Sequence, residues 1–184
     1  MAPPAPERGD RGGGRSLAER VLALLRERGW TLGVAESLTG GLVTATIVDV
    51  PGASVVLRGG IVAYATDTKA AVLGVDAALL AARGAVDPDV ACSMADAARR
   101  LLRADVGLAT TGVAGPDPQD GRPPGLVYVA VSLLGARHVR ELELLGDRAQ
   151  VRAGAVHAGL RLLVEAMGAT DSVPADAEDR RPLG

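Results

Sequence analysis

The chain has 184 residues, a formal net charge of −2 and 48% hydrophobic residues, but only 2% of its residues are aromatic. A near-neutral charge and few aromatic rings exclude a protein that follows a phosphate backbone and stacks on nucleic-acid bases. One cysteine and two histidines exclude an internal disulfide and make a poor set of metal ligands, and no stretch is long and apolar enough to span a membrane. We therefore expect one aliphatic-core domain without nucleic-acid, membrane, metal or cofactor partners.

The two ends of the chain differ in composition from the rest. Residues 1–15 are rich in Gly, Pro and Arg, and residues 168–184 are polar, so both are expected to be disordered tails. The first residues lack the apolar segment of a signal peptide, which favours a cytoplasmic location. Residues 16–167 are expected to form one domain.

The first half of this domain alternates helical and extended patterns. Ser16 with Glu19 forms a capping box, which predicts a helix that ends at Gly29. Residues 30–36 predict a short buried strand, and the apolar run that follows, to Val50, favours a helix. Residues 55–65 predict a second strand, in which a Gly-Gly pair indicates a bulge. The short helical stretch after this strand contains Lys69.

The second half begins with a long helix and then becomes rich in strands. Asp87 followed by Pro88 is an N-cap with proline in the first turn, and predicts a helix through Arg103. Residues 106–115 and 125–135 predict two apolar strands, and residues 137–145 alternate like a strand with one exposed face. Gly135 indicates a hairpin, and a last helix is expected to end near Met167. The order predicts an α/β fold with a mixed sheet of about five strands and helices on both faces.

Three segments that follow predicted strands are the candidate site, because ligands of open α/β sheets bind beyond the carboxyl ends of strands. The first is Glu-Ser-Leu-Thr-Gly-Gly, residues 36–41. Ser37 there is either a helix N-cap or a nucleophile whose neighbouring amides stabilise an oxyanion. From this segment alone the cap is the favoured interpretation.

The second segment contains the one lysine of the chain, Lys69, beside 19 arginines elsewhere. A lone lysine on a short helix is usually a solvated surface residue. To act as a base it would need a pKa lowered by burial or by other cations. Tyr64, five residues earlier, either lies close to it or sends its hydroxyl to solvent.

The third segment is the irregular stretch 110–125. Its candidates for an anion-binding nest of backbone amides are Thr110, Thr111, Gly112 and Gly115, and the alternative is an ordinary connecting loop. The stretch has neither the phosphate-loop nor the dinucleotide-binding glycine pattern. Arg148, in the first turn of the last helix, either holds a phosphate or carboxylate or lies in solvent. The residues alone indicate a small-anion pocket and name no reaction.

Five ordered blocks resemble the CinA C-terminal domain family: VAESLTGGLVTATIVDVPGAS, GGIVAYATDTKAAVLGV, GAVDPDVA, TTGVAGPDPQDGRPPGLVYVAV and GDRAQVRAGAV. The resemblance covers about residues 16–167. It implies a three-layer α/β/α sandwich with a mixed, mostly parallel sheet. It also implies a nicotinamide mononucleotide amidohydrolase, which converts the carboxamide to nicotinate mononucleotide and ammonia without a metal or cofactor, as stand-alone members do.

The resemblance also implies roles for single residues. Ser37 matches the nucleophile of the family, and Tyr64 and Lys69 match its tyrosine and lysine. In this scheme Lys69 is the base and Tyr64 relays or orients the proton. We expect the backbone amides of Thr39, Gly40 and Gly41 to form the oxyanion hole, and Thr111, Gly112 and Arg148 to contact the ribose or the phosphate.

The sequence departs from the family pattern at three places. Leu38 stands where the family usually has Cys, and Asp67 where Asn is common; a carboxylate near Lys69 would favour its protonated form. The loop Pro-Asp-Pro-Gln-Asp-Gly contains fewer glycines than many members have. Two alternatives therefore stay open: a non-catalytic module that binds pyridine nucleotides, and an amidase for another small amide. A homodimer is expected from apolar strand edges.

Overall fold

The computed structural model describes residues 15–170. Most of the two predicted tails, 1–15 and 168–184, therefore lies outside the described residues. The described elements, in chain order, are α1 (Leu17–Arg28), β1 (Leu32–Glu36), α2 (Leu42–Val48), the 3₁₀-helix η1 (Ala53–Val55), β2 (Leu57–Val62), α3 (Thr66–Ala71), α4 (Ala77–Arg83), α5 (Pro88–Leu101), β3 (Val106–Gly112), β4 (Leu126–Leu133), β5 (Ala136–Glu143) and α6 (Arg148–Thr170).

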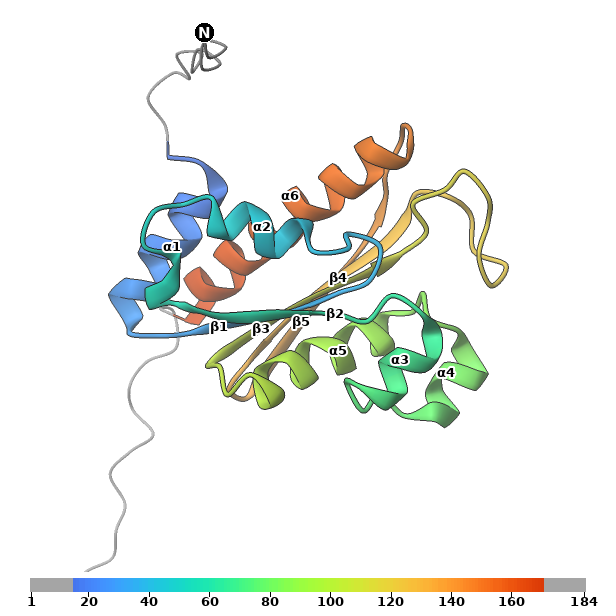
Figure 1. Cartoon of the computed structure of the whole chain (residues 1–184), viewed down its shortest axis with the longest axis horizontal. Helices are drawn as coiled ribbons and strands as arrows, with labels where there is room; N and C mark the ends of the chain where they lie inside the picture. Colours follow the sequence, from blue (N-terminus) through green and yellow to red (C-terminus); the bar gives the residue numbers. More distant parts are fainter. Residues whose placement is uncertain (1–14, 171–184) are drawn as a thin grey trace, which may run out of the picture.

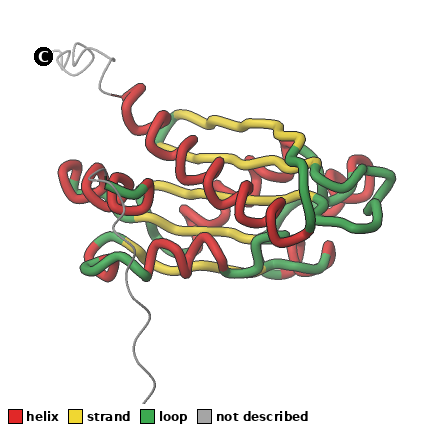
Figure 2. Tube along the Cα trace, turned by 90° about the horizontal axis from the view of Figure 1, so that it is seen from above, coloured by secondary structure: helices red, strands yellow, loops and turns green. Residues whose placement is uncertain are grey.

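The five described strands form one mixed sheet in the order β2-β1-β3-β4-β5, and the predicted fold class is confirmed. β1 pairs in parallel with both β2 and β3, whereas β4 is antiparallel to β3 and to β5. Four of these strands thus share a direction, and only β4 runs against them. The strands lie side by side in Figure 2 with helices crossing the sheet.

Helices cover both faces of the sheet and form the expected three layers. In Figure 1, α1, α2 and α6 lie on one face, and α3, α4 and α5 on the other. Each face has its own aliphatic core. α5 lies close to the sheet because β1 and β3 carry glycines beneath it: a Cβ at Gly33 would lie 2.8 Å from the carbonyl oxygen of Ala98, and one at Gly107 would overlap that of Ala95.

Local sequence signals account for most element boundaries. The capping box at Ser16 and Glu19 is present, with the Ser16 amide 2.7 Å from the Glu19 carboxylate. Asp87 caps α5 through the Asp89 amide. The bulge in β2 was expected at the pair Gly59-Gly60, whereas the register with β1 shifts one residue earlier, at Arg58. α4 falls in a stretch for which we predicted no separate element, and α6 continues three residues beyond Met167.

Two further features bear on the candidate function. Within residues 15–170, no three His, Cys, Asp or Glu side chains come together in a way that could hold a metal ion. In the same part of the chain, none of the helices combines the length and the apolar character needed to cross a bilayer.

Candidate active site

The three predicted segments meet at one edge of the sheet. β1, β2 and β3 are parallel, so their carboxyl ends lie together, and Ser37, Tyr64 and Gly112 stand at or just beyond these ends. Beside them is a cavity of about 220 Å³. Its lining comprises Ser37, Leu38, Tyr64, Ala65, Thr66, Gly112, Val113, Ala114, Gly115, Asp117, Gln119 and Arg148.

Ser37 and Lys69 are in direct contact although 32 residues separate them in the sequence. The Nζ atom of Lys69 lies 3.0 Å from the Oγ atom of Ser37. Lys69 is 1% exposed and Ser37 7% exposed. Nζ also donates to the carbonyl oxygens of Ala63, at 3.0 Å, and Tyr64, at 3.3 Å. Hydrogen bonds to these two carbonyls hold the amine in place, and its third hydrogen bond is the one to the serine hydroxyl.

Burial changes the proton affinity of this lysine. The loss of hydration lowers the pKa of Lys69 from its ordinary value of 10.5 to about 8, and the negative charge of Asp120 opposes the change. Asp67, which we considered as the source of such a charge, is exposed on α3, and its carboxylate accepts a hydrogen bond from the Thr68 amide. The carboxylate that favours the protonated lysine is thus in the β3–β4 loop.

The turn that carries Ser37 is held from inside by a buried carboxylate. Glu36 is 0% exposed and accepts hydrogen bonds from the amides of Gly41, Val43 and Thr44 and from the Thr44 hydroxyl, at 2.6–3.1 Å. The chain winds around this carboxylate because Gly40 and Gly41 adopt positive φ angles of 57° and 96°. Sequence reasoning did not identify Glu36 as part of the site.

The same turn is held from outside by an arginine of α6. Arg152 donates from Nε to the Leu38 carbonyl at 3.0 Å and from Nη2 to the Thr39 carbonyl at 2.8 Å. This residue was also missed. The available signal was its position four residues after Arg148, which puts both arginines on one face of the helix.

These contacts correct the expected oxyanion hole. The Gly40 amide donates to the Ser37 carbonyl at 3.0 Å and the Gly41 amide donates to Glu36 at 2.9 Å, so neither is available to a substrate. Leu38 and Thr39, by contrast, have amides without a hydrogen-bond acceptor among the described residues.

Tyr64 and Arg148 form the rim of the cavity. Nη2 of Arg148 donates to the Tyr64 hydroxyl at 2.7 Å, and Nη1 donates to the Gly115 carbonyl at 2.8 Å. The Tyr64 hydroxyl therefore faces Arg148, and Tyr64 contacts Lys69 only through its backbone carbonyl. Lys69 thus reaches Ser37 without the tyrosine hydroxyl, and a role of Tyr64 in relaying or orienting the proton stays a prediction.

The two candidate threonines lie behind the cavity. Thr39 is 0% exposed, and its hydroxyl is 2.7 Å from that of Thr110. Thr111 is 1% exposed and donates to the Ala85 carbonyl at 2.7 Å. Both hydroxyls join neighbouring segments and neither residue lines the cavity, so the contact to ribose or phosphate expected of Thr111 has no side-chain counterpart here. The expectation for Thr39 concerned its backbone amide.

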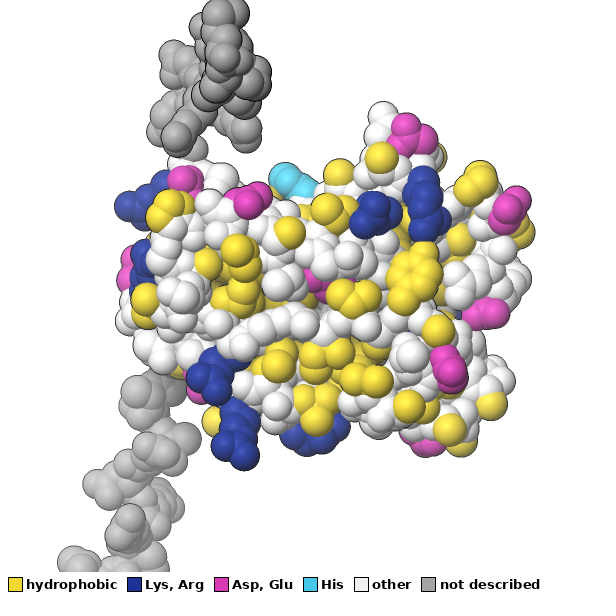
Figure 3. All heavy atoms as spheres, viewed as in Figure 1, with side chains coloured by type: hydrophobic (Ala, Val, Ile, Leu, Met, Phe, Trp, Pro, Cys, Tyr) yellow, Lys and Arg dark blue, Asp and Glu magenta, His cyan; other side chains and the backbone are white. Residues whose placement is uncertain are grey.

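The surroundings of the cavity are apolar on one side and polar on the other. Figure 3 shows an apolar edge of hydrophobic side chains near the carboxyl end of β2, with basic side chains next to it where α6 begins. The Tyr64 ring, 56% exposed, and Val62, 51% exposed, belong to this apolar edge. On the other side, an open groove of about 900 Å³ adjoins the cavity and shares Thr66 with it.

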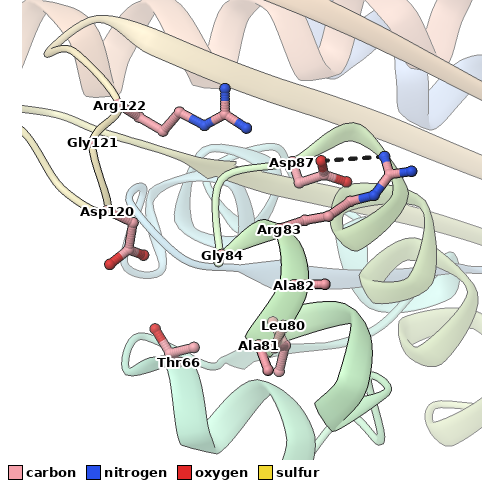
Figure 4. Close-up of a pocket in the computed structure, with 10 residues that line it drawn as sticks. All are labelled: Thr66, Leu80, Ala81, Ala82, Arg83, Gly84, Asp87, Asp120, Gly121 and Arg122. Carbon is pink, nitrogen blue, oxygen red and sulfur yellow. Dashed lines mark ion pairs between the residues drawn. The ribbon is translucent and has the colours of Figure 1, made fainter.

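The groove lies between α4 and the tip of the β3–β4 loop (Figure 4). Arg83 is paired there with Asp87, at 3.5 Å. Asp120 points from the loop toward Thr66, at the start of the helix that carries Lys69.

Comparisons with known proteins find similar sequences and structures over most of this chain. The family model of the CinA C-terminal domain matches residues 14–167. A CinA-like protein of Frankia casuarinae is 50% identical over 148 residues, which are 80% of this chain and 34% of that protein. A protein of Geobacillus kaustophilus named as a putative competence-damage inducible protein is 43% identical over 84% of this chain and 37% of its own length. The chain thus spans about a third of the length of these relatives.

Solved structures resemble the chain over nearly their whole length. A CinA superfamily protein of Klebsiella pneumoniae has a TM-score of 0.80 and 32% identity, and the match covers 83% of this chain and 96% of that one. A competence/damage inducible protein of Agrobacterium tumefaciens has a TM-score of 0.78 and 33% identity, with coverage of 83% and 93%.

Proposed function

Because the chain belongs to the CinA C-terminal domain family, we propose that it is an amidohydrolase that converts nicotinamide mononucleotide to nicotinate mononucleotide and ammonia. The observation that carries the proposal is the buried contact between Ser37 Oγ and Lys69 Nζ, at 3.0 Å beside a small cavity. A serine becomes a nucleophile when an adjacent base takes its proton, and a lysine becomes such a base when burial lowers its pKa.

The first half of the reaction forms an ester on the enzyme. Neutral Lys69 takes the proton of Ser37 while Oγ forms a bond to the carboxamide carbon, and the C=O electron pair moves onto oxygen. Lys69 then gives this proton to the amide nitrogen as the C–N bond breaks, and ammonia leaves. Two carbonyl acceptors, of Ala63 and Tyr64, keep the amine in place during both transfers.

The second half regenerates the serine. Water attacks the ester carbon, its proton passes to Lys69, and the C–O bond to Ser37 breaks as Lys69 returns the proton to Oγ. The amides of Leu38 and Thr39 are the best-placed donors for the oxyanion in both halves, since they directly follow the nucleophile and have no other acceptor among the described residues.

The rim of the cavity suits the rest of the substrate. Arg148 is held between Gly115 and Tyr64 and presents a cation where a phosphate would arrive. Gly112 lines the cavity, so the ribose would lie against its backbone; the absent side chain makes room for β4, since a Cβ there would lie 2.6 Å from the carbonyl oxygen of Leu126. A cytoplasmic location and a homodimer remain predictions.

The experiment is an ammonia-release assay on nicotinamide mononucleotide with the purified protein and two serine variants. We expect turnover by the parent and a loss of at least about 10³-fold in Ser37→Ala. Ser54→Ala, at an exposed serine on η1, is the matched control and should keep full activity. Equal ammonia release from Ser37→Ala would remove the nucleophile from the scheme.

Two other outcomes would redirect the proposal. Saturable binding of the nucleotide without ammonia release would favour a non-catalytic nucleotide-binding module. Ammonia release from another small amide, with none from nicotinamide mononucleotide, would keep the Ser37–Lys69 chemistry and change the substrate.

A further inference from the structure

The β3–β4 loop places two carboxylates around the candidate site, and the charge of one of them, Asp120, acts on Lys69. Asp117 lies on the lining of the cavity, and Asp120 lines the adjoining groove and points toward Thr66 (Figure 4). Neither side chain has a hydrogen bond or an ion pair within residues 15–170. For the chemistry of Lys69 alone Asp120 is unfavourable, since its negative charge stabilises the ammonium form, which cannot act as a base.

The other charged groups around Lys69 are directed elsewhere. The Glu36 carboxylate is turned toward the amides at the start of α2, and Arg152 is bound to the carbonyls of the serine turn. Asp67 is exposed, and Arg148 is held at the rim by Tyr64 and Gly115. The site therefore has a negative side at the loop and a positive side at α6.

A substrate with a positive charge facing the loop would interact favourably with the two carboxylates. We propose that Asp117 and Asp120 select a carboxamide carried on a positively charged ring, and that the bound ring in turn drives the proton off Lys69. The proposal rests on the amidohydrolase function above and adds to it a basis for substrate selection and for activation of the base. The same arrangement disfavours amides on neutral rings.

Simple geometry supports the second part of the proposal. Attack requires the carboxamide carbon roughly 3 Å from Ser37 Oγ, and Oγ is 3.0 Å from Nζ. A ring nitrogen that bears the charge is then roughly 7 Å from Nζ. At an effective dielectric constant of about 20, a unit charge at this distance disfavours the ammonium form by on the order of one pH unit or more. The ring charge thus acts on Lys69 in the direction opposite to Asp120.

Binding to the Ser37→Ala variant tests the selection separately from turnover. We expect oxidised nicotinamide mononucleotide, whose ring is cationic, to bind at least about 10-fold more tightly than its reduced dihydropyridine form, whose ring is neutral. Adding Asp117→Asn and Asp120→Asn together should remove most of this preference. Asn is suitable at position 120 because the backbone there has a φ of 50°, which Asn tolerates. Asp67→Asn is the matched control and should keep the preference.

Calorimetry in buffers of different ionisation enthalpy tests the activation of the base. At pH 8, binding of the oxidised nucleotide to Ser37→Ala should release protons, whereas the same variant with Lys69→Met should release none. Equal affinities for the two nucleotides, a preference that survives loss of both carboxylates, or binding without proton release would overturn the inference. Failure of the amidohydrolase function would instead be seen as absence of ammonia with the parent enzyme, whatever the binding results.

Discussion

Lys69 combines three properties that rarely occur together in one lysine: near-complete burial, two backbone acceptors and a serine hydroxyl as its third contact. A surface lysine would keep a pKa near 10.5 and would be almost wholly protonated at neutral pH. Here the desolvation of the amine lowers the pKa to about 8, which brings the neutral form within reach. The single lysine of the chain is therefore the group whose titration should control activity.

This gives a pH dependence with a defined sign. Only the neutral amine can accept the Ser37 proton, so kcat/KM should rise with pH and level off above the pKa of about 8. Below that value it should fall about tenfold for each pH unit. In Asp120→Asn the curve should shift to lower pH, because the charge that raises the pKa is gone. A flat profile between pH 6 and 9 would exclude Lys69 as the base.

At the scale of single elements, the site depends on how α6 meets the serine turn. Arg152 binds two consecutive carbonyls of that turn, and the Leu38 and Thr39 amides proposed as oxyanion donors belong to the same residues. Loss of the guanidinium should let these residues move and should misalign the donors. The position of Ser37 relative to the sheet thus depends on a helix that is distant in the sequence. Arg152 follows Thr39 by 113 residues.

We expect Arg152→Met to lower kcat by about 10- to 100-fold with little change in KM, because the guanidinium orients the reacting groups and does not itself touch the substrate. The free energy of unfolding should fall by about 1–3 kcal/mol, since two carbonyls lose their donor. Steady-state kinetics and urea unfolding measure the two effects. Arg161→Met, on the same helix but paired with Glu165 at the surface, is the control and should leave kcat unchanged. An unaltered kcat in Arg152→Met would show that the hydrogen bonds of Arg152 to the serine turn are not needed for catalysis.

The sequence predicted helix and strand boundaries well where neighbouring residues determine them. It predicted the orientation of buried side chains poorly. Ser16, Asp87 and Gly135 mark their boundaries through caps and a turn, which depend on neighbouring residues alone. The contact between Ser37 and Lys69 was expected from a family resemblance. Packing between distant elements determines that the side chains of Glu36 and Thr39 point inward and that Arg152 contacts the serine turn. The hydrophobic periodicity of one sequence does not specify this packing.

At the scale of the whole molecule, a buried amine reduces the stability of the fold. The pKa of Lys69 is lower in the folded protein than in the unfolded chain, so the unfolded chain binds more protons between about pH 8 and 10.5. In this window the free energy of unfolding should rise with pH. Below about pH 8 both states carry the proton, and the full destabilisation is present.

The measurement is denaturant unfolding of the parent protein and of Lys69→Met between pH 7 and 9.5. The stability of the parent relative to the variant should be constant near pH 7 and then rise, with a slope of up to about 1.4 kcal/mol per pH unit. Taking the difference removes the other groups that titrate here, including Cys92, whose pKa burial raises. A difference that stays constant to pH 9.5 would mean that the amine titrates as it does in water. Because the same proton governs both measurements, the pH at which relative stability begins to rise should match the midpoint of the activity profile.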